Sequence, residues 1–186
     1  TIGSSDDGRV TAARDEIVEE TGNEAVYAER CDLTDEASIR EATASAVETM
    51  GGLDVLVTNH PGPTGTTFAD ATVEDFDAVY ESVLRNTVVS VDAAIGALED
   101  GGGSIVNVVA ASTQEPTGGS LTADTMRPGI YGLSKSLANE YGGKDVRSNC
   151  LCPRGIMTDR IGHKLDLRAE RQGITYEEAY GQRTDA

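Results

Sequence analysis

Two side chains with complementary proton chemistry stand four residues apart in the segment IYGLSKSLANEY. On a helix, Tyr131 and Lys135 would lie on one face, one turn from each other. An ammonium group at that distance lowers the pKa of a phenol, and such a phenol can give a proton to a carbonyl oxygen during reduction. The spacing therefore raises the hypothesis of a proton-donating pair, and the elements around it must decide whether the pair is correctly placed.

Helical and strand-like patterns alternate along the chain. The first predicted helix ends at Gly22, and the second begins after the N-cap Thr34 and ends at Gly51–Gly52. Two longer helices are predicted over residues 72–99, where Thr72 and Asp75 can cap, and over residues 121–141. The predicted strands are residues 24–32, 53–59, 104–110 and 145–152. After Pro153 a polar tail carries a capping-box pattern from Thr175 to Glu178. Alternation of this kind predicts an α/β protein with a parallel sheet and crossover helices.

In an open parallel sheet, ligands bind beyond the carboxyl ends of the strands. The loops at residues 59–63, 110–115 and 153–160 follow three of the predicted strands, so we expect the functional groups there.

Composition excludes several classes of partner. The 186 residues suit one domain, and 32 acidic residues against 15 basic ones give a net charge of −17. Such a charge repels nucleic acid and anionic membranes. The abundance of Asp, Glu, Thr and Gly with few lysines is typical of proteins from a salt-saturated cytoplasm, although an ordinary acidic protein is the alternative.

No apolar run approaches the length of a membrane span and no signal peptide opens the sequence, so we expect a soluble cytoplasmic protein. Three cysteines and two histidines lack the spacing of zinc ligands, and no metal site is expected.

Four segments together resemble the short-chain dehydrogenase/reductase family. They are CDLTD, GGLDVLVTNHPGP, GGGSIVNVVAAS and DVRSNCLCPRGIMTDR, in the family's order and at its separations, and they cover roughly residues 25 to 160. The resemblance, closest to oxoacyl-carrier reductase-like members, implies a Rossmann-type doubly wound parallel sheet in three α/β/α layers. It also implies NAD or NADP as cofactor, although the sequence does not separate the two.

The resemblance assigns cofactor contacts residue by residue. Asp32 and Leu33 match the pair beside the adenine, and Asn59 matches the turn behind the cofactor, where His60 and Pro61 replace small residues. Two further positions, Ile156 and Thr158, match the pair that holds the nicotinamide amide, with Arg154 in place of a glycine.

The chain begins where the family has a Thr-Gly-x-x-x-Gly-x-Gly phosphate turn. Thr1, Gly3 and Gly8 can be aligned with this turn, but Ile2 and Asp6 stand where glycines are expected. Only about 24 residues separate Gly8 from Asp32, which leaves no room for a second strand and its helix. We therefore expect residues 1–186 to be a single dinucleotide-binding domain that lacks strands 1 and 2 and the C-terminal part.

The matched catalytic positions all depart from the family's pattern. Counting from Pro153 and from the strand at 104–110 places the tetrad of Asn, Ser, Tyr and Lys on Val83, Ala110, Ala123 and Arg127. The Tyr131–Lys135 pair lies eight residues further on, about 12 Å along a helix, so it is interpreted as a decoy.

Neither alanine can donate a proton. Arg127 keeps a positive charge without shuttling protons, and it can bind the cofactor ribose or lower the pKa of a neighbour. His60 is a candidate acid or base. Other polar residues are candidates for a rewired donor or for loop and capping roles: Ser112, Gln114, Glu115, Thr122, Asp124 and Thr125.

Three functions stay open. The first is an NAD(P)-dependent oxidoreductase acting on a small carbonyl or alcohol, and the second is a catalytically silent binding or assembly protein on the same fold. The third is a cofactor-free dehalogenase or lyase built on Arg127, because halohydrin dehalogenases also carry arginine at the lysine position. The resemblance also implies a homodimer or homotetramer, because members of the family commonly associate through two long helices, here residues 72–99 and 121–142.

Overall fold

The N-terminal thirty residues form a β-α-β unit. Strand β1 (Ile2–Ser4) leads into helix α1 (Asp7–Thr21), and strand β2 (Ala28–Arg30) returns parallel to β1, with Ile2 opposite Ala28. The Asp6 carboxylate caps α1 by accepting a hydrogen bond of 2.7 Å from the backbone N–H of Arg9. The segment that was expected to lack room for a strand and its helix thus contains the strand β1 and the helix α1 before β2.

The computed structural model describes residues 1–63, 65–116, 119–154 and 156–184. It divides into two compact units, residues 1–152 and residues 153–186, each considered by itself. Residue 155 of the predicted loop 153–160 lies outside the described residues.

Helix α2 (Glu36–Met50) follows β2 and connects the two parts of the first unit. Its N-cap is Asp35, whose carboxylate accepts from the backbone N–H of Ala37 at 3.0 Å. The prediction of Thr34 as N-cap is wrong, because the Thr34 hydroxyl instead donates to Asp32. Helix α2 packs on α4 (Asn86–Glu99), where Arg40 pairs with Asp92 at 2.8 Å.

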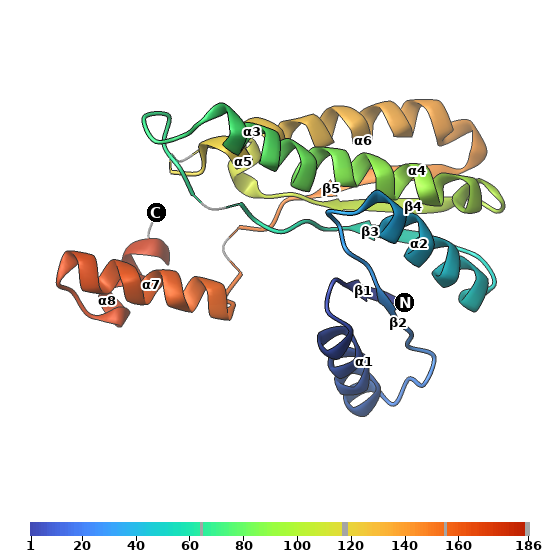
Figure 1. Cartoon of the computed structure of the whole chain (residues 1–186), viewed down its shortest axis with the longest axis horizontal. Coiled ribbons are helices and arrows are strands. Elements are labelled where there is room, and N and C mark those ends of the chain that lie inside the picture. The colour runs from blue at the N-terminus through green and yellow to red at the C-terminus, as the bar shows by residue number, and fades with distance from the viewer. Residues whose placement is uncertain (64, 117–118, 155, 185–186) are drawn as a thin grey trace. The chain divides into compact units, whose positions relative to one another are not determined.

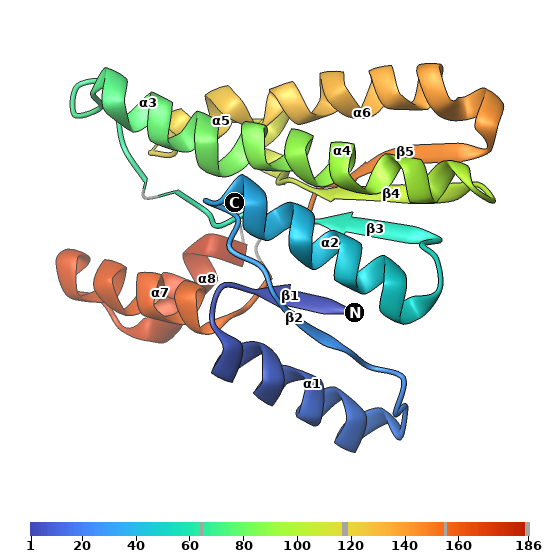
Figure 2. The same ribbon diagram turned by 45° about the vertical axis from the view of Figure 1, so that its right-hand side comes forward.

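Strands β3 (Val55–Thr58), β4 (Gly103–Val108) and β5 (Val146–Leu151) form a parallel sheet in that order. The crossover from β3 to β4 contains α3 (Val73–Val79), the π-helical turn η1 (Tyr80–Arg85) and α4. The crossover from β4 to β5 contains the short turn η2 (Ala111–Thr113), α5 (Leu121–Met126), α6 (Pro128–Tyr141) and the short turn η3 (Gly142–Lys144). Helices α4 and α6 run side by side over one face of this sheet (Figures 1 and 2).

The main core lies between these two helices and the sheet. Leu98 of α4, Ile105 of β4 and Val146 of β5 are fully buried in it. Gly103 lets α4 approach the start of β4, because a Cβ atom there would lie 2.6 Å from a Leu98 methyl carbon. The opposite face of the sheet is more open: Val55 and Val57 are 53% and 59% exposed.

A buried polar network crosses the three strands near their carboxyl ends. The Thr58 hydroxyl donates to Asn107 Oδ1 at 2.8 Å, and Asn107 Nδ2 lies 3.5 Å from the Ser148 hydroxyl. Ser148 in turn contacts the Ser134 hydroxyl of α6 at 2.9 Å. Since Asn107 is completely buried, each of these groups depends on the others for its hydrogen bonds.

The second unit contains helices α7 (Asp159–Gln172) and α8 (Tyr176–Thr184). Leu165 and Ala169 of α7 bury Ala179 of α8 in a small apolar cluster. The predicted capping box is confirmed: the Thr175 hydroxyl accepts from the backbone N–H of Glu178, and the Glu178 carboxylate accepts from that of Thr175.

The predicted α/β class is confirmed, since every strand pair in the described residues is parallel and helices connect the strands. The predicted helix ends at Gly22 and Gly51 are confirmed by their left-handed backbone conformation, and the Thr72–Asp75 capping box is present. Within the described part of the chain, no helix combines the length and the apolar character that a membrane span requires.

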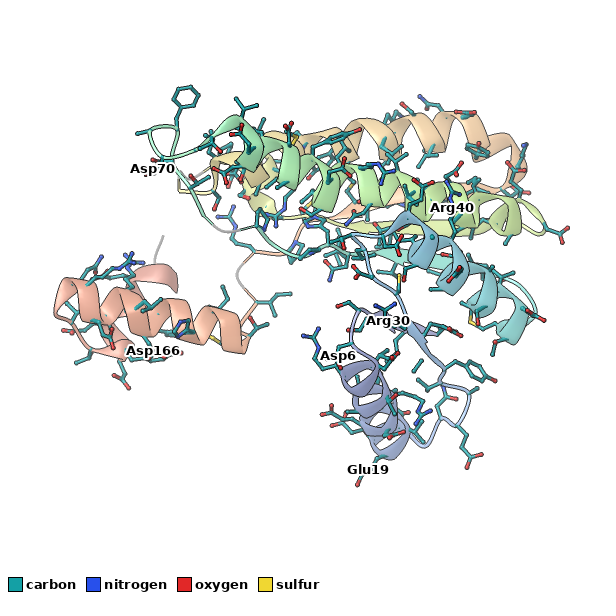
Figure 3. All side chains as sticks on the ribbon, viewed as in Figure 1. Asp6, Glu19, Arg30, Arg40, Asp70 and Asp166 are labelled. Carbon is teal, nitrogen blue, oxygen red and sulfur yellow. The ribbon has the colours of Figure 1, made fainter. Side chains whose placement is uncertain are left out.

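Many of the acidic side chains that the structure describes lie on the surface. Glu19 on α1, Asp70 before α3 and Asp166 on α7 are exposed (Figure 3). At a net charge of −17 their mutual repulsion destabilises the folded state in dilute buffer.

Substitution of Asn107 by Ala is expected to lower the free energy of unfolding by about 3 kcal/mol, because it leaves the Thr58 and Ser148 hydroxyls without their partner inside the core. Denaturant unfolding measures this change. The control is Asn149→Ala on the adjacent strand, whose side chain is exposed. Equal effects of the two substitutions would contradict the role of the network.

Addition of KCl is expected to raise the unfolding temperature steeply between low and molar concentration, because salt screens the repulsion between the carboxylates. Thermal unfolding followed by circular dichroism tests this. An unfolding temperature that does not depend on KCl would show that surface repulsion is not a major term.

Candidate functional site

The candidate site is built at the carboxyl ends of β3 and β4. Asn59 and His60 follow β3, and Val109 and Ala110 follow β4. The Thr58–Asn107 hydrogen bond joins the two strands one residue before Asn59 and fixes where these residues emerge.

The turn after β3 is held by its own side chains. Asn59 Oδ1 accepts from the backbone N–H of His60 at 2.9 Å, and His60 Nδ1 lies 3.3 Å from the carbonyl oxygen of Pro61. A carbonyl oxygen only accepts, so this contact favours the proton on Nδ1 and leaves the lone pair on Nε2. Nε2 is buried, and no hydrogen-bond partner for it occurs among the described residues.

Arg127 stands at the junction of α5 and α6 and is half-buried. Its backbone N–H donates to the carbonyl oxygen of Ala123, so α5 and α6 join through a helical residue. Burial lowers the pKa of His60, and the positive charge of Arg127 lowers it further. The fold therefore places Arg127 near enough to His60 for its charge to act on the imidazole, although the two residues are 67 positions apart in the sequence.

The other matched tetrad positions are closed or inert. Val83 is fully buried in an apolar cluster, and Ala123 is 3% exposed. Ala110 is half-buried in extended backbone, and its carbonyl oxygen accepts from Thr113. None of these side chains can donate a proton.

Asn86, one turn after Val83, is also buried, but its side chain serves its own helix. Its amide donates to the carbonyl oxygen of Ser82, and its Oδ1 accepts from Thr87 at 3.3 Å. These contacts lie at the end of the π-helical turn, where the Asn86 amide provides a hydrogen bond to a backbone carbonyl oxygen.

Tyr131 occupies a different environment from Lys135. Its hydroxyl lies 2.7 Å from Cys152 Sγ and accepts from Gln114 Nε2 at 3.1 Å, whereas Lys135 is exposed. The hydrogen bond with Cys152 raises the pKa of Tyr131, with burial as the second cause. This is opposite to the acidified phenol that the spacing of the pair suggested.

Asp32 lies just after β2 in a local turn. Its Oδ1 accepts from the backbone N–H of Thr34 at 2.9 Å and from the Thr34 hydroxyl at 2.7 Å. These two hydrogen bonds lower the pKa of Asp32 and keep the carboxylate charged. Leu33 beside it is half-buried.

The remaining predicted cofactor residues lie in two other places. Thr1 is exposed ahead of β1, and Gly3 lies within β1 opposite Glu29. A Cβ atom on Gly3 would lie 3.1 Å from the Cβ atom of Cys31. Ile156 and Thr158 are exposed in the second unit, where the Thr158 carbonyl accepts from the backbone N–H of Ile161 at 2.8 Å as α7 begins.

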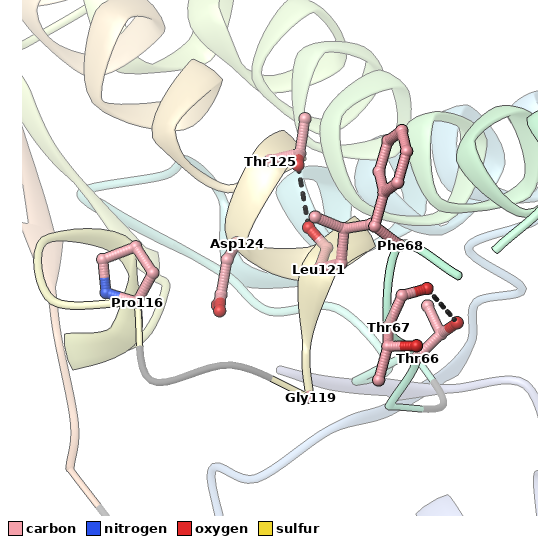
Figure 4. Close-up of a pocket in the computed structure, with 8 residues that line it drawn as sticks. All are labelled: Thr66, Thr67, Phe68, Pro116, Gly119, Leu121, Asp124 and Thr125. Atoms are coloured by element: carbon pink, nitrogen blue, oxygen red, sulfur yellow. Dashed lines mark hydrogen bonds between the residues drawn. The ribbon is translucent and has the colours of Figure 1, made fainter. Parts of the chain in front are cut away.

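A pocket of about 470 Å³ opens beside α5 (Figure 4). Its lining comes from the loop after β3, the loop after β4 and α5: Thr66, Thr67, Phe68, Pro116, Gly119, Leu121, Asp124 and Thr125. The sequence analysis names Asp124 and Thr125 as candidates for a rewired donor or for loop and capping roles, and it does not name the other lining residues, because no motif marks them. Asp124 directly follows Ala123, so the pocket adjoins one of the matched catalytic positions.

The described residues contain no cluster of three or more His, Cys, Asp or Glu suited to a metal ion. The ionisable groups that the structure brings to this region include the His60 imidazole, the Arg127 guanidinium and, in the neighbouring pocket, the Asp124 carboxylate.

Comparisons with known proteins agree on the family. The family model described as enoyl-(acyl carrier protein) reductase matches residues 4–182. The chain is 32% identical over 142 residues to 2-(R)-hydroxypropyl-CoM dehydrogenase of Xanthobacter autotrophicus, covering 74% of this chain and 56% of that protein. It is 30% identical over 136 residues to D-threitol dehydrogenase of Mycolicibacterium smegmatis, covering 72% and 52%.

The fold agrees with solved structures. An NADPH-bound short-chain oxidoreductase of Pseudomonas aeruginosa, described as containing an atypical catalytic center, superimposes with a TM-score of 0.83 at 22% identity, over 90% of this chain and 65% of that one. The chain spans about half the length of the curated relatives named above. The family model covers nearly all of it, and the chain belongs to the short-chain dehydrogenase/reductase family.

Proposed function

We propose that this chain belongs to an NAD(P)-dependent oxidoreductase that interconverts an alcohol and a carbonyl compound. The observation that carries the proposal is the parallel sheet whose carboxyl edge presents Asn59, His60 and Ala110, with Arg127 near enough to His60 to lower its pKa. Ligands of open α/β sheets bind at this edge. Family membership supports the same reading.

The residues present fit a nicotinamide nucleotide. The Asp32 carboxylate is held charged in a fixed turn, as a hydrogen-bond acceptor for the adenosine part must be, and half-buried Leu33 offers an apolar contact. We assign Asn59 to the turn behind the cofactor, Arg127 to its ribose, and Ile156 and Thr158 to the carboxamide.

Thr1 and Gly3 have less support as phosphate contacts. Both precede α1 by several residues, and Gly3 is engaged in the β1–β2 pair. We therefore retain Asp32, Leu33, Asn59, Ile156 and Thr158 as the cofactor set.

The nicotinamide ring, when bound, accepts or gives the hydride. The chain must handle the proton, and neither Ala110 nor Ala123 can do so. We assign that role to His60, whose Nε2 lone pair can accept the proton of an alcohol. Arg127 acts on His60 through its charge, which disfavours the imidazolium form and keeps Nε2 available.

A silent relative that binds without catalysis is the second candidate. The loss of hydroxyl groups at Ala110 and Ala123 favours it, because both matched positions are chemically inert. A cofactor-free dehalogenase or lyase is the third, and it would need no nucleotide. The three differ in nucleotide binding and turnover.

We further propose that the protein works in the cytoplasm, that residues 1–186 belong to one dinucleotide-binding domain, and that it forms a homodimer or homotetramer. The first long helical stretch supports the last point, because Val73, Tyr80 and Val88 are exposed apolar side chains along it.

Nucleotide binding tests the proposal first. Calorimetry on the full-length protein in molar KCl is expected to detect one of NAD, NADH, NADP or NADPH. Arg127→Ala is expected to weaken that nucleotide by roughly tenfold or more, because it removes a charged hydrogen-bond donor. Lys135→Ala, which removes an exposed cation from the same helical stretch, is the matched control. No binding at millimolar nucleotide would refute the oxidoreductase assignment.

The pH dependence of alcohol oxidation tests His60. Because a base must be neutral, kcat/KM is expected to fall as pH drops through a pKa that lies below the ordinary 6.5 of histidine. His60→Gln is expected to lose about a hundredfold in kcat/KM and to abolish this pH step, and added imidazole should restore part of the rate. An unchanged pH profile in His60→Gln would assign the proton to another group.

A further inference from the structure

The Tyr131 hydroxyl joins three segments of the first unit at the carboxyl edge of the sheet. It accepts a hydrogen bond of 3.1 Å from Gln114 Nε2, in the loop after β4, and lies 2.7 Å from Cys152 Sγ, directly after β5. Ligands of an open α/β sheet bind beyond this edge. A side chain of α6 therefore connects two of the loops at the edge where a ligand binds.

The aromatic ring of Tyr131 is anchored by the apolar cluster beneath it. The ring packs against a cluster that contains Val83, Val109 and Ile130, and Cys152 packs against the same cluster. Ile130, the residue before Tyr131, is 1% exposed. Because a close-packed cluster resists displacement, the hydroxyl is presented to both loops from a fixed position.

The loop after β4 needs a contact that fixes its position. As far as Val109, backbone hydrogen bonds hold the end of β4 to β5. In the turn η2 that follows, the backbone N–H of Thr113 donates to the carbonyl oxygen of Ala110 at 3.1 Å. A local hydrogen bond of this kind fixes the shape of the turn but not its position relative to α6. The contact between Gln114 and Tyr131 supplies that second constraint.

The Tyr131 hydroxyl keeps its proton near neutral pH. The hydrogen bond with Cys152 raises the pKa of Tyr131, burial adds to the rise, and hydrogen bonds with Thr113 and Gln114 oppose it. A phenol whose pKa lies above its ordinary value of about 10 is protonated at neutral pH. The hydroxyl can therefore donate to the sulfur while it accepts from the amide of Gln114.

The loop held by Tyr131 carries two positions that matter for a substrate. Ala110, at its start, is one of the matched catalytic positions. Pro116, two residues after Gln114, lines the pocket beside α5. A shift of the loop would move both positions, so the fit of a substrate depends on where the loop is held.

We propose that Tyr131 is a positioning residue, which holds the loop after β4 in place for substrate binding through its contacts with Gln114 and Cys152. This inference rests on the proposed oxidoreductase function and concerns the substrate side of that site. Tyr131 takes no proton from the substrate, and that role stays with His60. Lys135, exposed one turn later on α6, takes no part in the arrangement.

The first test follows the loop itself and needs no substrate. Hydrogen exchange of the full-length protein, measured by mass spectrometry, reports how readily the backbone amides of residues 111–115 open. Tyr131→Phe is expected to speed this exchange roughly fivefold, because the ring stays and the hydroxyl is lost. Tyr141→Phe, at the C-terminal end of the same helix, is the matched control and should leave the exchange unchanged. Equal exchange in the wild type and Tyr131→Phe would overturn the proposal.

The contact with Cys152 is tested by a conservative pair of substitutions. Cys152→Ser keeps an atom that can accept the hydrogen bond, whereas Cys152→Ala removes it. The alanine variant is expected to match Tyr131→Phe in the exchange of residues 111–115, and the serine variant to stay close to the wild type. The double variant should exchange no faster than Tyr131→Phe alone. Additive effects, or a serine variant that behaves like the alanine variant, would contradict the coupling.

Steady-state kinetics distinguishes positioning from proton transfer. With cyclohexanol and 2-butanol as probe substrates, Tyr131→Phe is expected to raise KM roughly fivefold, while kcat and the nucleotide Kd stay within about twofold of the wild type. Tyr141→Phe should leave all three values unchanged. A large loss of kcat at unchanged KM would make Tyr131 a proton-transferring residue and overturn the proposal.

The outcomes also separate this inference from the proposed function. Nucleotide binding and turnover with an unaffected KM in Tyr131→Phe would refute the positioning role alone. Absence of nucleotide binding would refute the proposed function, and the exchange of residues 111–115 would still decide whether Tyr131 holds the loop.

Discussion

Asn107 holds the three-stranded sheet in register at the level where its functional residues emerge. Its side chain lies between Thr58 of β3 and Ser148 of β5, and Ser148 extends the contact to Ser134 of α6. Because the Asn107 amide is buried, water cannot replace a lost hydrogen-bond partner, so each partner must stay in position. The positions of Asn59, His60 and Ala110 all follow from that constraint, because each lies within three residues of the network along its own strand.

In the proposed assignment the site keeps the family's frame but handles the proton with other groups. Alanines stand at the two positions that the resemblance assigns to hydroxyl groups, and the proposal gives the proton to His60 and a charge role to Arg127. Arg127 cannot exchange a proton near neutral pH. Its charge lowers the pKa of His60, and lowering the pKa of a neighbour is one of the two roles predicted for it, the other being contact with the cofactor ribose.

Local features of the fold were predictable because they depend on neighbours in sequence. The left-handed glycines at 22 and 51, the Thr72–Asp75 box and the Thr175–Glu178 box are each settled within four residues. Strand β1 was missed because three residues are too few to show an alternating pattern, and Gly3 in its middle suggested a turn. The Tyr131–Lys135 spacing was correct helix geometry but carried no information about the Cys152 thiol that meets the hydroxyl.

The candidate site was less predictable because its contacts join distant segments. Nothing in the sequence relates Thr66 to Leu121, or His60 to Arg127, before the sheet and its crossovers are formed. Asp124 could be named as a polar residue, but its place in the lining of a pocket depends on loops that are distant in the sequence.

The most direct test of the account follows a single hydride. The full-length protein is mixed with NADH or NADPH that carries deuterium at the reactive ring carbon, together with a panel of small ketones, and the alcohol products are examined by mass spectrometry. The account predicts deuterium on the new carbinol carbon, in a yield that falls with His60→Gln while the nucleotide stays bound. Bound nucleotide with no label transferred to any carbonyl would contradict it and leave a silent binding protein on the same fold.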